Sequence, residues 1–129
     1  MAEPKGGGLM TLTLFIPGPL PGLNDFLGKG KHWAYNEEKK RWAETIGWEI
    51  KRQHLAPMGR VFIRWTWQEK DQRRDPDNVT GIGKKFILDS LAKAGILKND
   101  GWKQIAGWTD TWVVVPDSPG VTVILEEQR

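Results

Sequence analysis

The chain contains no cysteine, and this absence excludes several kinds of site at once. A disulfide framework, a cysteine nucleophile and a zinc site with thiolate ligands are all ruled out. His32 and His54 are its two histidines, so a metal site built from three imidazoles is ruled out as well. Any metal ion bound here would need mainly oxygen ligands, which favours Mg²⁺ or Mn²⁺ over zinc.

Long apolar runs are also missing. No run approaches the roughly 20 residues of a membrane-spanning helix, and no signal-peptide core follows Met1. We therefore expect a cytoplasmic protein that does not attach to a membrane. The 129 residues, 39% of them hydrophobic and 27% charged, suit one globular domain. A net charge of +3 is compatible with nucleic-acid binding without establishing it.

The hydrophobic periodicity predicts six regular elements in the order β-α-β-α-β-β. They are expected as a strand within 10–18, a helix from about Asn36 to His54, a strand at 60–69, a helix at 78–94, and strands at 103–116 and 120–127. Residues 1–9 are expected to be a flexible leader, and residues 10–129 the domain. This order predicts a single α+β domain with a small mixed sheet and two helices.

Two aspartates lie one residue apart in the segment "RRDPDNV", residues 73–79. Pro76 disfavours helical backbone at Asp75, and in an extended backbone Asp75 and Asp77 would point the same way. Carboxylates placed so repel each other unless a cation lies between them, which favours a divalent metal ion. The alternative is a helix cap, in which Asp77 or Asn78 caps the helix that follows.

Further charged residues follow on and after the second expected helix. Lys85 and Asp89 are one helical turn apart, so their side chains should be neighbours. Taken alone, this pair is typical of a solvated surface ion pair. Asp100 comes after the helix and would approach Asp77 only if the intervening turn folds back along the helix.

Three segments together resemble the pattern of the RusA-type Holliday junction resolvases, small endonucleases of bacteria and prophages. They are "RRDPDNV", "KKFILDSLAKAGIL" and "NDGWKQI". The family pattern is D-x-D-N, then a helix carrying K-x-x-x-D-x-L, then an acidic turn before a strand. The earlier "PGPLPGLNDF" is similar to the family's Pro-rich segment and supplies Asn24. The resemblance covers most of the chain from about residue 10 and agrees with the expected order of elements.

The resemblance implies a dimeric, Mg²⁺-dependent endonuclease that cuts Holliday junctions or other branched DNA by phosphodiester hydrolysis, in recombination and repair. It implies that Asp75, Asp77 and Asp100 bind the metal ion, which could also be Mn²⁺. Lys85 matches the catalytic lysine of the family. Asp89 matches the helix aspartate, which either completes a second metal site or orients Lys85.

The chain departs from the family pattern at two points. Asn99 stands where the family has the first of two acids, and glycines precede Lys85, which makes Lys84 the alternative catalytic lysine. A catalytically impaired protein that binds branched nucleic acid on the same scaffold is therefore an alternative function. A third is an interaction protein in which some of the eight tryptophans form a partner surface.

Several residues are candidates for DNA contacts. Arg73 and Arg74 are placed to bind phosphates beside the cleaved phosphodiester bond, because a guanidinium binds phosphate through two hydrogen bonds. The loop that contains Lys29, Lys31 and His32 is a candidate DNA-binding arm, although it could equally be a solvated loop. Asn24, which precedes this loop, could equally belong to a turn. The candidates are Arg73, Arg74, Lys84, Lys29, Lys31, His32 and Asn24.

Overall fold

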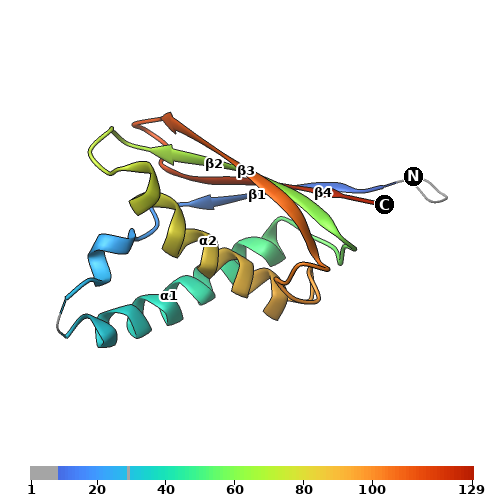
Figure 1. The fold of residues 1–129 in the computed structure, drawn as a ribbon, viewed down its shortest axis with the longest axis horizontal. Coiled ribbons are helices and arrows are strands. Elements are labelled where there is room, and N and C mark those ends of the chain that lie inside the picture. The colour runs from blue at the N-terminus through green and yellow to red at the C-terminus, as the bar shows by residue number, and fades with distance from the viewer. Residues whose placement is uncertain (1–8, 29) are drawn as a thin grey trace.

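The computed structural model describes residues 9–28 and 30–129, so most of the expected leader and Lys29 lie outside the described residues. Two helices cover one face of a four-stranded sheet (Figure 1). The elements are β1 (Thr11–Pro17), the short 3₁₀ helix η1 (Leu23–Phe26), α1 (Lys31–Arg52), β2 (Val61–Glu69), α2 (Pro76–Lys93), β3 (Ile105–Val114) and β4 (Gly120–Glu127). The predicted α+β fold class and order of elements are confirmed.

The sheet is mixed, with the spatial order β1-β4-β2-β3. β4 pairs antiparallel with both β1 and β2, whereas β3 runs parallel to β2. A parallel pair requires the chain to return to the end where the first strand began, and α2 makes that return. β1 and β3 are therefore the two edge strands. Among the described residues, neither helix is long and apolar enough to cross a membrane.

The core lies between the sheet and the two helices. Side chains on alternate residues of a strand share a face, and the face turned to the helices is apolar. Most residues of the apolar faces predicted from the sequence are buried: Leu14 and Ile16 on β1, Val61, Ile63, Trp65 and Trp67 on β2, Trp42, Ile46 and Ile50 on α1, and Val79, Phe86, Ile87 and Leu91 on α2. Leu12 and Ile82 are partly buried, and Ala94 is exposed. The packing of these faces fixes both helices against the sheet.

The first helix begins earlier than the sequence predicts. Gly30, not Asn36, is its N-cap, with φ 79° and ψ −5°, a left-handed conformation that glycine adopts readily. The side-chain amide of Asn36 instead lies 3.3 Å from the His32 ring, one turn back. Lys31 and His32 were expected in a DNA-binding loop and lie in the first turn of α1 instead.

The second helix begins at Pro76, and Gly81 and Gly83 do not interrupt it. Proline suits the first helical turn because its fixed φ is helical and its missing N–H has no partner there. Gly83 lies directly over Trp67: a Cβ at this position would be 2.9 Å from the indole ring. This glycine therefore allows α2 to lie close to β2, although glycine weakens a helix in isolation.

Candidate functional site

Asp75 and Asp77 lie at the N-terminal end of α2, and both are exposed. Asp75 is the N-cap residue with extended backbone, φ −69° and ψ 149°, as the following proline predicts. Asp77 belongs to the first helical turn. The prediction that both lie on one extended segment is therefore wrong, because the backbone of Asp77 is helical. The helix dipole stabilises negative charge at this end of the helix.

Helix capping does not account for these carboxylates. The side chain of Asp75 forms no capping hydrogen bond, although the residue occupies the N-cap position. Asn78 acts elsewhere: its Oδ1 accepts a hydrogen bond from the backbone N–H of Asn24 at 2.7 Å. Gly22 lies so close that a Cβ there would be 2.9 Å from Asn78. Asn78 thus holds the loop around η1 against α2, and the DNA contact expected of Asn24 stays a prediction.

Arg74 anchors the segment that precedes the two aspartates. Its Nε and Nη2 donate hydrogen bonds to the two carboxylate oxygens of Glu69 at 2.9 and 2.8 Å. Its Nη1 donates to the carbonyl oxygen of Leu20 at 2.9 Å. A bidentate ion pair of this kind is stronger and better defined than an ordinary surface pair. The phosphate contact expected of Arg74 stays a prediction, and it would compete with these bonds.

The aspartates themselves have no cationic partner in the described part of the chain. Arg74, the adjacent residue, is paired with Glu69. The Nε of Arg73, two residues before Asp75, is 3.5 Å from Asp71, and its side chain is 86% exposed. Neither Asp75 nor Asp77 forms an ion pair within residues 9–28 and 30–129. Among the described residues these two carboxylates thus lack an ion-pair partner, and the guanidinium of Arg73 is exposed beside Asp71.

Lys84 is directed at β3 rather than at solvent. Its Nζ lies 2.9 Å from Oδ2 of Asp110 and 4.2 Å from the centre of the Trp108 ring. Asp110 also accepts a hydrogen bond from the indole N–H of Trp67 at 2.8 Å. The DNA contact expected of Lys84 would require this arrangement to open, and it stays a prediction. Asp110 was not singled out from the sequence, because only the register of β2 and β3 brings it to Lys84.

Lys85 and Asp89 are neighbours on α2, as predicted, with Nζ 3.5 Å from Oδ2. The side chain of Lys85 is 55% exposed and that of Asp89 is 37% exposed, which is the arrangement of a weak surface ion pair. Lys85 follows Asp77 by eight residues, which corresponds to about 12 Å along the helix axis at 1.5 Å per residue. The catalytic roles expected of Lys85 and Asp89 stay predictions.

Asp100 lies beyond the opposite end of α2, in the turn before β3. The 18 residues of α2 rise about 27 Å, and the turn leads directly into β3 instead of folding back along the helix. Within residues 9–28 and 30–129, no three acidic or histidine side chains form a group that could hold a metal ion. The expectation that Asp100 joins Asp75 and Asp77 in one chain is therefore wrong. The cause is the parallel pairing of β2 and β3, which puts the start of β3 at the far end of the sheet.

Two hollows lie along β3, one at each end. The first has a volume of about 270 Å³ and is lined in part by Asp75 and by the indole of Trp112. The second has a volume of about 460 Å³, and its lining includes Arg60, Asp100 and Trp108. The two acidic positions that are separated in one chain thus each border a recess along the same edge strand.

Comparison of the chain with protein-family models and with curated proteins finds no match. The resemblance to the RusA-type resolvases therefore rests on the quoted motif residues alone. The activity, the metal and the partners that it implies are accordingly proposals for this chain.

Proposed function

We propose that this chain is a Mg²⁺-dependent endonuclease that hydrolyses phosphodiester bonds in branched DNA as a homodimer. The observation that carries the proposal is the pair Asp75 and Asp77, exposed at the start of α2 and without an ion-pair partner in the described part of the chain. Uncompensated carboxylates attract a hard divalent cation. The "RRDPDNV" pattern, which resembles the RusA-type motif, gives the substrate class.

The donor chemistry of these residues fits Mg²⁺, with Mn²⁺ as a substitute, but a single copy offers too few donors for a site of three carboxylates. Mg²⁺ prefers carboxylate oxygens and usually keeps several water ligands, so Asp75 and Asp77 would hold it. A bound ion would supply an activated water and stabilise charge on the phosphate. Asp100 lies at the other end of α2, so it would contribute only from a second copy.

The other residues near the aspartates have distinct parts in this proposal. Arg73 presents a guanidinium to solvent, which suits a bidentate contact with a phosphate beside the cut. Arg74 keeps its pair with Glu69 and thereby fixes the segment from which Asp75 projects. Asn78 fixes the η1 loop next to it. Positioning of this kind lowers a barrier because the reacting groups need not be ordered during the reaction.

A mixing experiment tests both the activity and the shared site. Asp77→Asn and Asp100→Asn are each expected to lose Mg²⁺-dependent nicking of a four-way junction while retaining junction binding. When the two variants are unfolded and refolded together, a heterodimer contains one site with both substitutions and one intact site. Random pairing into two-fold dimers then restores about a quarter of the sites. Refolding each variant alone provides the control.

The outcomes separate the claims. Unchanged cleavage by Asp77→Asn, or cleavage that survives EDTA, would overturn the proposed metal-dependent function. Two inactive variants that stay inactive after mixing would overturn the sharing of a site between copies, because a site within one copy cannot be rebuilt by exchange.

A catalytically impaired DNA-binding protein is the second candidate, and Asn99 is the observation that favours it. This residue occupies the position of a family acid, and its Oδ1 accepts the backbone N–H of Gly101 at 2.8 Å. The side chain thus serves to shape the turn. Salt-dependent junction binding that Mg²⁺ leaves unchanged, with no cleavage of any branched substrate, would support this candidate.

A further inference from the structure

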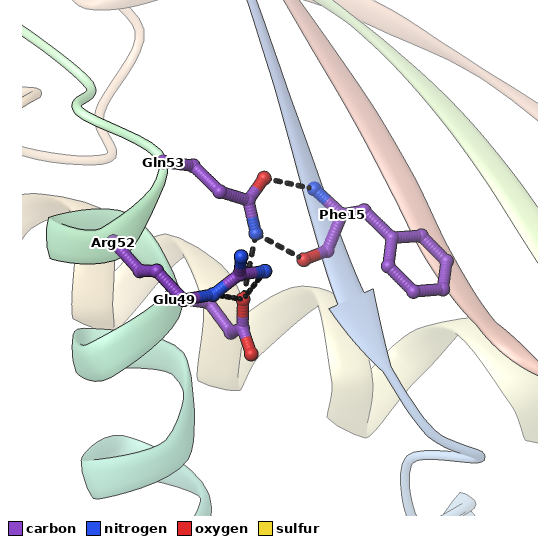
Figure 2. Close-up of polar contacts among 4 residues, drawn as sticks. All are labelled: Phe15, Glu49, Arg52 and Gln53. Carbon is purple, nitrogen blue, oxygen red and sulfur yellow. Dashed lines mark hydrogen bonds and ion pairs between the residues drawn. The ribbon is translucent and has the colours of Figure 1, made fainter.

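The edge formed by β3 is long, apolar and unpaired in the described part of the chain. β3 has ten residues, with neither lysine nor proline, and nothing described pairs with its outer side. Its exposed hydrophobic residues are Trp108, Trp112, Val113 and Val114. Such an edge offers free backbone N–H and C=O groups to another chain, and proteins that remain monomeric usually block it. The opposite edge, β1, is blocked by the side chain of Gln53 (Figure 2).

We propose that β3 pairs antiparallel with β3 of a second copy, about a two-fold axis that lies midway between Asp110 and the partner's Asp110. The two sheets then form one continuous sheet, with both pairs of helices on the same face. This interface deepens the proposed function, because it names the surface that would bring Asp100 of one copy to Asp75 and Asp77 of the other. Only the metal-binding role of these aspartates rests on the proposed function.

The sequence of β3 fits such an axis. Residues 108–112 read Trp-Thr-Asp-Thr-Trp, which is the same in both directions. Antiparallel pairing centred on Asp110 puts Trp108 opposite the partner's Trp112, and Thr109 opposite the partner's Thr111. Aromatic pairs and threonine pairs directly across two antiparallel strands stabilise a sheet. A partner of unrelated sequence would have no reason to match this symmetry, which favours a second copy.

The central carboxylate does not prevent the pairing. Two Asp110 side chains would meet near the axis, and like charges placed opposite each other destabilise a sheet. Each is already compensated within its own chain by Lys84 at 2.9 Å and by the indole N–H of Trp67 at 2.8 Å. Both partners lie on the helix side of the sheet, so they leave the outer backbone of β3 free.

The two ends of β3 carry complementary features. Arg60 and Lys103 are exposed near its beginning, whereas Asp75 and Asp77 are exposed near its end. Antiparallel pairing sets the beginning of one β3 against the end of the other, so Arg60 and Lys103 come to the end of the interface that carries the partner's two aspartates. It also brings the recess that Asp100 borders next to the partner's recess at the start of α2.

Lysine substitutions on the two edges test the proposal. Thr109→Lys with Thr111→Lys puts new ammonium groups opposite one another across the proposed axis, while both threonines are exposed in the single chain. The matched control is Thr11→Lys with Thr13→Lys on the exposed face of β1. Sedimentation equilibrium is expected to give twice the chain mass of 14.7 kDa for the unsubstituted protein and for the control. The β3 variant is expected at the single-chain mass with an unchanged circular dichroism spectrum.

Cysteine pairs test the register, and the chain has no cysteine of its own to interfere. A mixture of Thr109→Cys and Thr111→Cys chains is expected to form a disulfide-linked dimer on mild oxidation, because directly opposite residues meet the distance requirement. Each variant alone is expected to cross-link several-fold less. A mixture of Thr13→Cys and Thr111→Cys serves as the control and should remain uncross-linked.

The results distinguish this inference from the proposed function. An unsubstituted protein at the single-chain mass, a β3 lysine variant that stays dimeric, or equal cross-linking in the control mixture would each overturn the β3 interface. Mass and cross-linking measure neither cleavage nor metal binding. A dimer that passes both tests but never cleaves DNA overturns the nuclease function and leaves the interface intact. A monomer that cleaves DNA overturns the interface and the site shared between copies, but leaves the nuclease activity intact.

Discussion

At the edge formed by β1, a glutamine side chain takes the place of a neighbouring strand, whereas no side chain in the described residues does so at the edge formed by β3. Gln53 accepts the N–H of Phe15 at 2.9 Å and donates to its carbonyl oxygen at 2.8 Å (Figure 2). The same Nε2 donates to Glu49 at 2.7 Å. The amide thus reproduces the hydrogen bonds that a partner strand would make.

The difference follows from where each helix ends. α1 ends at Arg52, so Gln53 emerges beside β1. Gln53 donates a hydrogen bond to Glu49, and Arg52 donates two to the same carboxylate oxygen. Pro17, the last residue of β1, has no N–H to offer. On the β3 side, α2 supplies Lys84, which contacts side chains of the strand and not its backbone. One edge is thereby completed within the chain, and the other has no pairing partner among the described residues.

Among substitutions at the two edges, Lys84→Met beside β3 is expected to cause the largest loss of stability. The substitution leaves the carboxylate of Asp110 without its ammonium partner in a place where both side chains are mostly buried. Unpairing a buried charge and losing the contact with Trp108 should reduce the free energy of unfolding by about 2–3 kcal/mol. Urea denaturation followed by tryptophan fluorescence measures the change.

Lys85→Met is the matched control, because the next residue of the same helix forms only an exposed ion pair with Asp89. Its effect should stay below about 0.5 kcal/mol. Equal losses for the two variants would mean that the Lys84 pair is solvated and does not support β3.

The sequence predicts those parts of this comparison that depend on local periodicity. The alternation of Val61, Ile63, Trp65 and Trp67 predicts a strand with one buried face, and the structure has it. Spatial strand order is not encoded locally, so the parallel pairing of β2 and β3 went unpredicted. This pairing separates Asp100 from Asp77.

Single residues that act over long distances were missed for the same reason. Lys84 and Asp110 are 26 residues apart, and no spacing rule links them. Gln53 and Phe15 are 38 residues apart, and a glutamine at a helix end has no special signature. The start of α1 was misplaced because Asn36 is a good N-cap by type, whereas Gly30 takes the position through its left-handed backbone.

Gln53→Leu should open the β1 edge. The N–H and C=O of Phe15 then lose their partners in a partly buried place, and the free energy of unfolding should fall by about 1–2 kcal/mol. The exposed backbone should also promote self-association at high concentration, since the chain would then have two open edges. Urea denaturation and light scattering measure the two effects.

The control for this variant is Gln72→Leu, which changes an exposed glutamine in the loop after β2. It should alter neither stability nor scattering. A stable, non-associating Gln53→Leu protein would show that water closes the β1 edge as well as glutamine does, and the contrast between the two edges would lose its meaning.

The smallest change in the free energy of unfolding is expected at Glu49, whose carboxylate accepts a hydrogen bond from Gln53. Burial raises the pKa of Glu49, but hydrogen bonds from Arg52 and Gln53 and the charge of Arg52 outweigh it, and the pKa lies below its ordinary value of 4.5. Because the folded-state pKa is the lower one, ionised Glu49 stabilises the fold above pH 4.5, and this stabilisation disappears as the pH falls through the folded-state pKa.

Glu49→Gln should therefore reduce the free energy of unfolding by about 1 kcal/mol at pH 7, a modest value because Arg52 is half exposed. The difference from the unsubstituted protein should shrink as the pH is lowered below 4.5 in urea titrations. Glu38→Gln is the control: Arg41 lowers the pKa of Glu38 too, but the pair is exposed and should contribute less than about 0.5 kcal/mol. A difference for Glu49→Gln that persists unchanged at low pH would assign the effect to packing and not to the charge that holds Gln53 against β1.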